Sequence, residues 1–271
     1  MALPLPPQVF AILSGLIEDR SGLHYASEHR ELLAEKVSPR AIDAGFTSLL
    51  DYYYFLRYDP AGVAELDALV ETLCVHESYF FREAEQLRVV VDELVVPAVR
   101  QGSTPRLWCA AAANGEEPVT LAIMLAERDI LDRVEIVASD ISERALSRAR
   151  RGVYGARAAR ALPESVLGRW IHATAGGYEV DPELTRGVDW RRVNLIDREA
   201  IRSLGKFDVI LCRNVLIYFS DATILTIAAN LSVSLAPSGS LLLGVSESLL
   251  RFGTALTCEE RGGVFLYRRA P

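Results

Sequence analysis

Short apolar runs alternate with helix-like segments after residue 105, and this alternation is the feature that most constrains the fold. The runs of strand length are RLWCAAA (106–112), VEIVASD (134–140), FDVILCR (207–213) and SLLLGVS (240–246). Segments with helical spacing separate them, at 116–129, 142–151 and 221–236. Apolar strands in alternation with helices predict a mostly parallel sheet that is buried on both faces. VFLYRR (264–269) is expected to add a late, antiparallel strand.

The first 90 residues show helical spacing and no strand pattern. Apolar residues recur three and four positions apart, as at Phe10, Leu13, Leu16, Ile17, Leu66, Leu69, Val70 and Leu73. Further along, turn signals at Gly176-Gly177 and Asp181-Pro182 indicate a small β-insertion. We therefore predict an N-terminal helical domain with the start of a linker over residues 1–90. An α/β domain should follow over residues 91–271, with the insertion at about 155–193.

Composition excludes several classes of protein. The chain has 271 residues, half of them apolar, so it is long enough to bury a sizeable core. Its net charge of −7 argues against a general nucleic-acid binder. The four cysteines and four histidines have neither zinc-ligand nor disulfide spacing, so we predict no metal and a reducing compartment. No signal peptide and no apolar stretch of roughly 18–20 residues is evident, and we expect a cytoplasmic protein without membrane insertion.

Polar residues stand where the first two predicted strands end, and ligands of open α/β sheets bind at that edge. The first strand runs into Ala113-Asn114-Gly115-Glu116, and the second ends at Asp140. A carboxylate at the end of the second strand is a good acceptor for the two hydroxyl groups of a ribose. The alternative is that Asp140 only caps the helix that follows.

Acids rather than glycines begin the helix after the first strand. The G-x-G-x-x-G fingerprint of dinucleotide-binding proteins is missing, since only Gly115 is present. Glu116 and Glu117 would repel a pyrophosphate, but they suit a cationic nucleoside without phosphates, and S-adenosylmethionine fits that description. Glu117 would accept a hydrogen bond from its ammonium group. The alternative is that both acids only complement the helix dipole.

Several separated motifs resemble those of the chemotaxis receptor methyltransferases, the CheR-type enzymes that methylate receptor glutamates. They are ESYFFRE (77–83), LWCAAAANGEEPVTLAI (107–123), VASDISERALSRARRGVY (137–154), VNL (193–195), FDVILCRNVLIYFS (207–220) and LAPSGSLLLGVSES (235–248). The motifs follow the family's order from about residue 70 to the end, whereas the N-terminal helices fit more loosely. The resemblance implies a Rossmann-like class I methyltransferase sheet with an N-terminal helical domain and a small β-insertion.

The resemblance also implies roles for individual residues. Arg82 and Tyr218 would be the catalytic residues, and the segment 76–82 would close over the cofactor. The residues implied in binding S-adenosylmethionine, or its product S-adenosylhomocysteine, are His76, Ser78, Arg82, Ala113, Glu117, Asp140, Asn194, Leu195, Arg213 and Asn214. The alternatives are that Arg82 pairs with a neighbouring acid and that Tyr218 is a core aromatic residue.

No catalytic base is evident, and the implied reaction needs none. A glutamate carboxylate has an unperturbed pKa of about 4.3, so it is already ionised near neutral pH. Its oxygen would attack the methyl carbon of the sulfonium in line, oriented by Arg82 and Tyr218. The predicted function is methylation of glutamate side chains on the cytoplasmic helical region of a chemoreceptor or a related signalling protein, by a monomer. A small-molecule methyltransferase and an inactive cofactor-binding scaffold are the alternatives, and a nicotinamide oxidoreductase is a more distant one.

Two features depart from the family pattern. His76 stands where an asparagine is expected, which makes its contact sensitive to pH near a pKa of about 6.5. Family members often carry an arginine-rich helix near the N-terminus for receptor docking, but the segment 27–45 is nearly balanced in charge. Pro39 is expected to interrupt this segment. Electrostatic steering of an acidic receptor by these residues would be weak.

Overall fold

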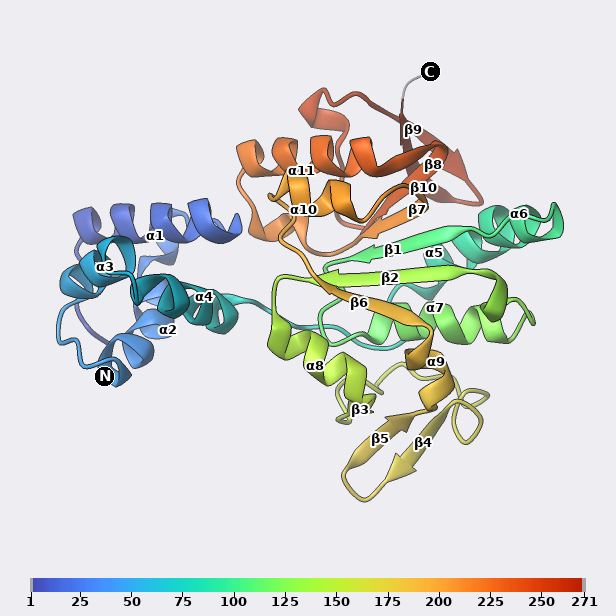
Figure 1. Ribbon diagram of the computed structural model, residues 1–271, viewed down its shortest axis with the longest axis horizontal. Coiled ribbons are helices and arrows are strands. Elements are labelled where there is room, and N and C mark those ends of the chain that lie inside the picture. Colours follow the sequence, from blue (N-terminus) through green and yellow to red (C-terminus); the bar gives the residue numbers. More distant parts are fainter. Residues whose placement is uncertain (1, 270–271) are drawn as a thin grey trace. The chain divides into compact units, whose positions relative to one another are not determined.

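The computed structural model describes residues 2–269, which form two compact units (Figure 1). The first unit holds the chain up to Val75 together with Tyr218–Thr223. The second unit holds His76–Ile217 and the chain from Ile224 onward. Within the described residues, no helix is both long enough and apolar enough to cross a bilayer.

The division between the units falls at Val75–His76 because the residues that follow are buried in the second unit. Phe80, Leu87 and Val90 are part of its hydrophobic core. We therefore propose this position as the domain boundary, in place of the one that we expected near residue 90.

The first unit is built from helices, as predicted. They are α1 (Pro7–Ser21), η1 (Ser27–His29), α2 (Arg30–Asp43), α3 (Leu49–Tyr58) and α4 (Gly62–Leu73). Leu13 and Ile17 of α1 meet fully buried residues of α2 and α3 in one apolar core. The Tyr52 hydroxyl of α3 (2.6 Å) and the Arg40 guanidinium of α2 (2.8 Å) both donate to Glu65 of α4, so three helices share one carboxylate.

Helix α2 continues through Pro39, contrary to our expectation that the proline would interrupt it. Proline removes one backbone donor from a helix interior. Val37 and Ala41, however, are completely buried on either side of it. The Ser38 hydroxyl also donates to the Ala34 carbonyl (2.5 Å). Packing of the apolar face of α2 therefore outweighs the lost hydrogen bond.

The second unit contains a seven-stranded sheet in the order β6-β2-β1-β7-β8-β10-β9. The strands are β1 (Arg106–Ala110), β2 (Glu135–Asp140), β6 (Val188–Arg192), β7 (Phe207–Cys212), β8 (Leu235–Leu243), β9 (Leu256–Arg261) and β10 (Val264–Arg269). The first five in this order run parallel, and β10 is antiparallel to both β8 and β9. The predicted parallel strands and the late antiparallel strand are confirmed. We did not predict the edge strands β6 and β9, whose side chains are mostly exposed in β6 and partly exposed in β9 and show no apolar run.

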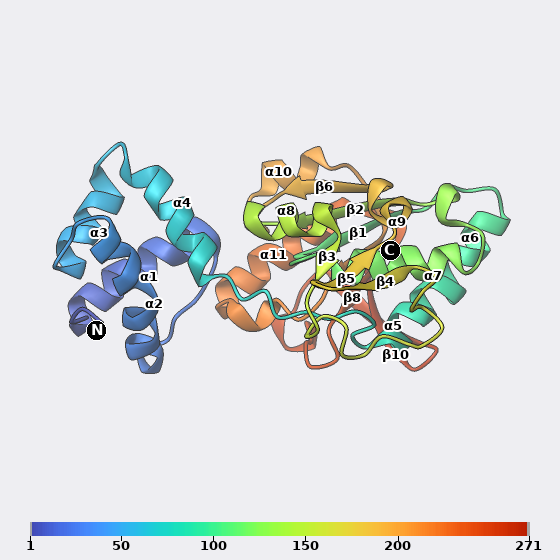
Figure 2. The same cartoon turned by 90° about the horizontal axis from the view of Figure 1, so that it is seen from below.

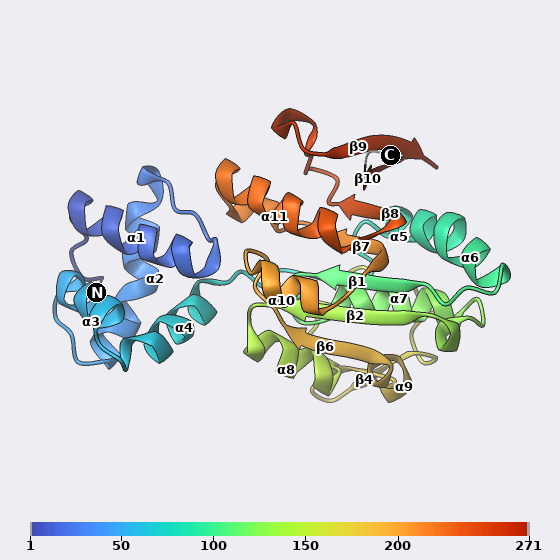
Figure 3. The ribbon, with the colours of Figure 1, turned by 45° about the horizontal axis from the view of Figure 1, so that its top comes forward.

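Helices cover both faces of this sheet. On one face lie α5 (Ala84–Val89), η2 (Val90–Val95), α6 (Val96–Arg100), α7 (Glu116–Ala126) and α8 (Glu143–Arg151), and on the other lie α10 (Arg198–Ser203) and α11 (Asp221–Ser234) (Figures 1, 2 and 3). Leu107 and Cys109 of β1 enter the core under α7. Trp108 points to the opposite face, where its ring lies 5.3 Å from that of Phe207. The arrangement confirms the expected Rossmann-like class I methyltransferase sheet.

A separate three-stranded antiparallel sheet forms the insertion. It consists of β3 (Val153–Tyr154), β5 (Gly177–Val180) and β4 (Ile171–Thr174), in that order. Gly177 has a φ of +137°, and a Cβ atom there would lie 2.3 Å from the Tyr154 carbonyl oxygen, so the turn requires glycine. The short α9 (Pro182–Arg186) then leads into β6 of the large sheet.

Candidate functional site

Backbone strain collects at the carboxyl ends of the central strands and in the segment 81–83. Among the described residues, the non-glycine residues with positive φ are Phe81, Glu83, Ala111, Ala113, Asp129 and Asn214. All but Asp129 belong to this segment or to the turns that follow β1 and β7. Such residues cost of order 1–3 kcal/mol each and cluster at sites where surrounding contacts fix them.

The turn between β1 and α7 is held by the carboxylate at the end of β2. Asp140 accepts hydrogen bonds from the backbone amides of Ala113 and Ser142, both at 2.9 Å. Gly115 starts α7 with a φ of +93°, and a Cβ atom there would lie 2.7 Å from the Ala149 side chain. The turn therefore needs glycine for close approach to α8 and not for approach to a phosphate.

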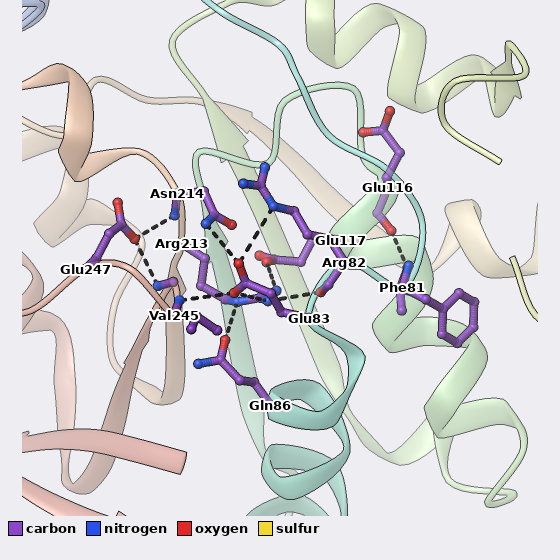
Figure 4. A network of polar contacts seen from close by, with 12 residues as sticks. Phe81, Arg82, Glu83, Gln86, Glu116, Glu117, Arg213, Asn214, Val245 and Glu247 are labelled. Carbon is purple, nitrogen blue, oxygen red and sulfur yellow. Dashed lines mark hydrogen bonds and ion pairs between the residues drawn. The ribbon is translucent and has the colours of Figure 1, made fainter. Parts of the chain in front are cut away.

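Arg213, directly after β7, is the centre of a buried polar network (Figure 4). Its side chain is 2% exposed. Nη1 donates to Glu117 of α7 (2.6 Å), Nε donates to Gln86 of α5 (3.2 Å), and Nη2 donates to both Glu83 (2.9 Å) and the Arg82 carbonyl (3.0 Å). One guanidinium thus joins β7, α7 and the segment that carries Arg82.

Two carboxylates tie the neighbouring turns to this network (Figure 4). Glu83 also accepts from the Asn214 amide side chain and the Val245 backbone, each at 3.2 Å. Glu247 accepts from three backbone amides, those of Asn214 (2.6 Å), Leu216 (2.7 Å) and Gly244 (2.9 Å). The chain after β7 is therefore held from both sides by acids that belong to other segments.

Burial and ion pairing act in opposite directions on the pKa values of this network. Burial opposes ionisation of Glu83, but Arg213, Asn214 and the Val245 amide together hold its pKa below the ordinary value. Burial raises the pKa of Glu117, with the Arg213 cation working against the shift. Burial likewise disfavours the Arg213 cation, but Glu117 and Glu83 raise its pKa above the ordinary value.

Glu116 lies beside the network and is a second buried acid. It is 2% exposed, and burial raises the pKa of its carboxyl to about 7. Its backbone carbonyl accepts from the Thr120 hydroxyl (2.7 Å), which in turn accepts from the amide of Phe81 (3.1 Å). This chain of bonds fixes the strained segment 81–83 to the first turn of α7.

Several residues predicted from the sequence come together here. Arg82, Glu117, Arg213 and Asn214 belong to the network of Figure 4 or border it. The Arg82 guanidinium donates to the Glu77 carbonyl (3.1 Å) and lies 3.9 Å from Glu83. The alternative in which Arg82 pairs with a neighbouring acid is thus partly observed.

The other predicted residues lie on adjoining segments. The His76 carbonyl accepts from Asn114 of the β1–α7 turn (3.3 Å), and Ser78 follows it, half-buried. After β6, the Val193 amide donates to the Asp140 carbonyl (3.0 Å), which brings Asn194 and Leu195 to the end of β2. These segments surround the same strand ends.

Tyr218 belongs to the first unit of the structure and Arg82 to the second. The Tyr218 carbonyl accepts from the His24 amide (2.9 Å), and Phe219 forms a β-bridge with Leu23. The structure therefore does not unite the two predicted catalytic residues within one unit.

Sequence reasoning missed Glu83, Gln86 and Glu247 as members of this region. Glu83 and Glu247 do stand inside the motifs ESYFFRE and LAPSGSLLLGVSES, so a signal was present. Within the part of the chain that the structure describes, no three His, Cys, Asp or Glu side chains are arranged to hold a metal ion.

The fold is that of a Rossmann-like protein, and acids rather than a glycine-rich fingerprint follow its first strand. Comparison with known families agrees. Residues 76–261 match the model of the CheR methyltransferase SAM binding domain, and residues 8–74 match that of the CheR methyltransferase all-alpha domain. The chain belongs to the CheR methyltransferase family, and its second unit is the S-adenosylmethionine-binding domain of that family.

Curated relatives are similar over most of their length. Chemotaxis protein methyltransferase 2 of Vibrio cholerae is 34% identical over 241 residues, which is 87% of this chain and 83% of the relative. The chemotaxis protein methyltransferase of Escherichia coli is 32% identical over 252 residues, 91% of this chain and 86% of the relative. Among solved structures, TrmN from Thermus thermophilus is 19% identical over 64% of this chain and 46% of that chain, with a TM-score of 0.37.

Proposed function

We propose that this protein transfers a methyl group from S-adenosylmethionine to glutamate side chains of a chemoreceptor or a related signalling protein, in the cytoplasm. The observation that carries the proposal is that both CheR family models match, one after the other, along residues 8–74 and 76–261. The relatives in Vibrio cholerae and Escherichia coli are chemotaxis protein methyltransferases by name. The glutamate specificity and the receptor substrate are the proposed part.

The acids at the strand ends fit S-adenosylmethionine. Asp140 at the end of β2 would accept from the ribose hydroxyls, because it lies at the carboxyl edge of the sheet and a carboxylate can accept several hydrogen bonds at once. Oε2 of Glu117 accepts a hydrogen bond from Arg213, and Oε1 would accept one from the ammonium group. A pyrophosphate would face two acids at the start of α7, where dinucleotide-binding proteins offer bare backbone amides.

The proposed reaction requires this chain to orient the reactants and does not require it to transfer a proton. When bound, the cofactor supplies a methyl group activated on a sulfonium centre. The acceptor glutamate is already ionised, with an ordinary pKa of about 4.3, so the site needs no general base. Arg82 would orient the acceptor carboxylate, because a guanidinium has five donors and the hydrogen bond to the Glu77 carbonyl uses one. Tyr218 is the second residue proposed to orient the acceptor.

Arg213 supports this role of Arg82 without touching the acceptor. It binds the Arg82 carbonyl (3.0 Å) and the adjacent Glu83 (2.9 Å), and so fixes the backbone from which the Arg82 side chain extends. Holding a reacting group in place contributes to rate by removing the entropy cost of alignment.

The direct test is transfer of labelled methyl groups to membranes and lysate of the source organism, followed by treatment with alkali. Methyl esters release volatile methanol under alkali, so we expect base-labile label in a band of receptor size. Arg82→Ala should abolish this label, whereas Arg88→Ala, at an arginine of the following helix with a 44% exposed side chain, should keep it. Base-stable label would point to another acceptor group.

The rival functions give different results in the same assay. Transfer only to low-molecular-weight acceptors would favour a small-molecule methyltransferase. Binding of S-adenosylhomocysteine with no transfer to any fraction would favour the signalling scaffold.

A further inference from the structure

Positive charge is concentrated in one short stretch of this acidic chain. Residues 142–161 hold six arginines and one acid, Glu143, so the stretch carries +5 in a protein whose net charge is −7. The stretch comprises α8, β3 and the loop that follows. An uneven distribution of this size produces a strong local potential, which draws partners of opposite charge.

Three of these arginines form one face of α8. Arg144, Arg148 and Arg151 are four and three positions apart, so they project from the same side of the helix. The buried residues Ala145, Leu146 and Ala149 lie on the opposite side and pack against the domain. The one acid of the helix, Glu143, pairs with Arg150, which lies away from this face.

The arginine face, defined as Arg144, Arg148 and Arg151 with Arg157 of the following loop, is exposed to solvent. Within residues 2–269, no ion pair or side-chain hydrogen bond joins Arg148, Arg151 or Arg157 to an acid. Cations in the last turn of a helix are favoured by its dipole, which accounts for Arg148 and Arg151 in part. The dipole does not reach Arg157, which lies beyond the end of the helix. Like charges at this spacing destabilise a helix, so the face is not explained by the stability of α8.

The loop that carries Arg157 is attached to the segment of the candidate catalytic Arg82. The Phe80 amide donates to the Ala158 carbonyl (2.9 Å). Arg160 pairs with Glu77 (2.9 Å), and its guanidinium lies 3.8 Å from the centre of the Tyr79 ring. The stretch that begins with α8 therefore ends in contact with the segment that carries Arg82.

We propose that the arginine face is the docking surface for an acidic helical surface of the methyl-accepting protein. This inference rests on the proposed function, because a protein that presents glutamates for methylation carries acidic side chains around them. A surface of one sign next to the site would speed encounter and orient the partner. It would also supply the attraction that the nearly balanced segment 27–45 lacks.

The test is a charge reversal at two positions with a matched control. The variant is Arg148→Glu/Arg151→Glu, and the control is Arg198→Glu/Arg202→Glu, two exposed arginines of α10 on the other face of the sheet. Both change the charge by the same amount. The readouts are binding of a labelled cytoplasmic helical fragment of a chemoreceptor from the source organism, measured by fluorescence anisotropy, and the KM for that fragment in methyl transfer.

We expect the α8 variant to weaken binding of the fragment and to raise its KM by about tenfold at low salt. Because salt screens exposed charges, the difference should shrink towards wild type near 0.5 M salt. S-adenosylhomocysteine affinity should stay within about twofold of wild type, and the α10 control should behave as wild type. An unchanged KM, an equal effect of the control, or failure of the wild-type protein to bind the fragment would overturn the proposal.

Two outcomes separate this inference from the proposed function. Normal methyl transfer by the α8 variant would leave the function in place and remove the docking surface. Salt-sensitive binding that the α8 variant loses, without any methyl transfer by the wild type, would keep the docking surface and remove the function. Loss of RNA binding by the α8 variant, with its binding of the fragment intact, would assign the face to nucleic acid and refute the proposal.

Discussion

Replacing Glu83 by glutamine tests whether the network around Arg213 stabilises the methyltransferase domain. Glu83 accepts three hydrogen bonds, from Arg213 (2.9 Å), Asn214 (3.2 Å) and the Val245 amide (3.2 Å). Glutamine keeps the size of the side chain but removes the charge and turns a new NH₂ group toward these donors. Removing one partner of a buried ion pair costs about 3–5 kcal/mol. The Glu83 side chain is 21% exposed, so we expect the lower end, about 3 kcal/mol.

The measurement is urea unfolding followed by tryptophan fluorescence. All three tryptophans of the chain, Trp108, Trp170 and Trp190, lie in the second unit, so the signal reports on the domain that holds Glu83. The matched control is Glu85→Gln, two residues along, whose side chain is 85% exposed. An exposed ion pair contributes about 0.5 kcal/mol or less, and the control should stay within that range.

The same comparison has a predicted pH dependence. The pKa of Glu83 is lowered in the folded protein from an unfolded value near 4.5. Its contribution is therefore present above the unfolded pKa and is lost as the pH falls through the folded pKa. The difference in the free energy of unfolding between wild type and Glu83→Gln should shrink at acidic pH. A penalty no larger than that of Glu85→Gln, or a gap that stays constant through the acid range, would refute this reasoning.

The site makes three further predictions. Glu117→Ala and Asp140→Ala should each weaken S-adenosylhomocysteine binding by about 1.5–3 kcal/mol in titration calorimetry, through lost hydrogen bonds to charged groups, and unchanged binding by both would remove them from the cofactor site. Glu116 has a folded pKa of about 7 against 4.5 unfolded, so its proton stabilises the folded state at low pH and this contribution is lost as the pH rises to about 7. The free energy of unfolding of the wild type should therefore fall by about 3 kcal/mol relative to that of Glu116→Gln between pH 4.5 and 8, as measured by denaturant unfolding. The same pH dependence in both proteins would contradict this. Gly115→Ala should destabilise by about 1–3 kcal/mol more than Gly102→Ala, because both have φ near +90° but only at Gly115 does the added carbon meet packed side chains; equal melting temperatures would exclude the clash.

The elements of the α/β domain were predictable because each central strand is buried on both faces. A run such as FDVILC, with its helix-like neighbours, has no other stable arrangement at this length. Edge strands lack that signal: most side chains of β6 are exposed and those of β9 are only partly buried, and only the strand order shows that they join the sheet. Helix propensity also led to a wrong prediction at Pro39, where tertiary packing keeps α2 intact.

The acids of the site were predictable by position but not by partner. Asp140 ends the second strand and Glu117 lies in the first turn of the helix after the first strand, so their place at the carboxyl edge follows from the alternation of elements. Glu83 and Arg213 lie 130 positions apart, and they meet only because β7 is inserted beside β1 in the sheet. No local pattern of residues contains that information.

The contacts of Arg213 could not be read from its motif. The family resemblance implies a cofactor-binding role for it, and in the structure all of its side-chain nitrogens donate to Glu117, Glu83, Gln86 or the Arg82 carbonyl. The guanidinium therefore fixes the backbone of the segment 81–83, where Phe81 and Glu83 both have positive φ. A strained segment stays in place only when its surroundings determine it more strongly than its own torsions do. Arg213 is buried, charged and bonded to both the Arg82 carbonyl and the Glu83 carboxylate. It is therefore the group best placed to hold Arg82 at a site where orientation, rather than acid–base chemistry, is the proposed source of catalysis.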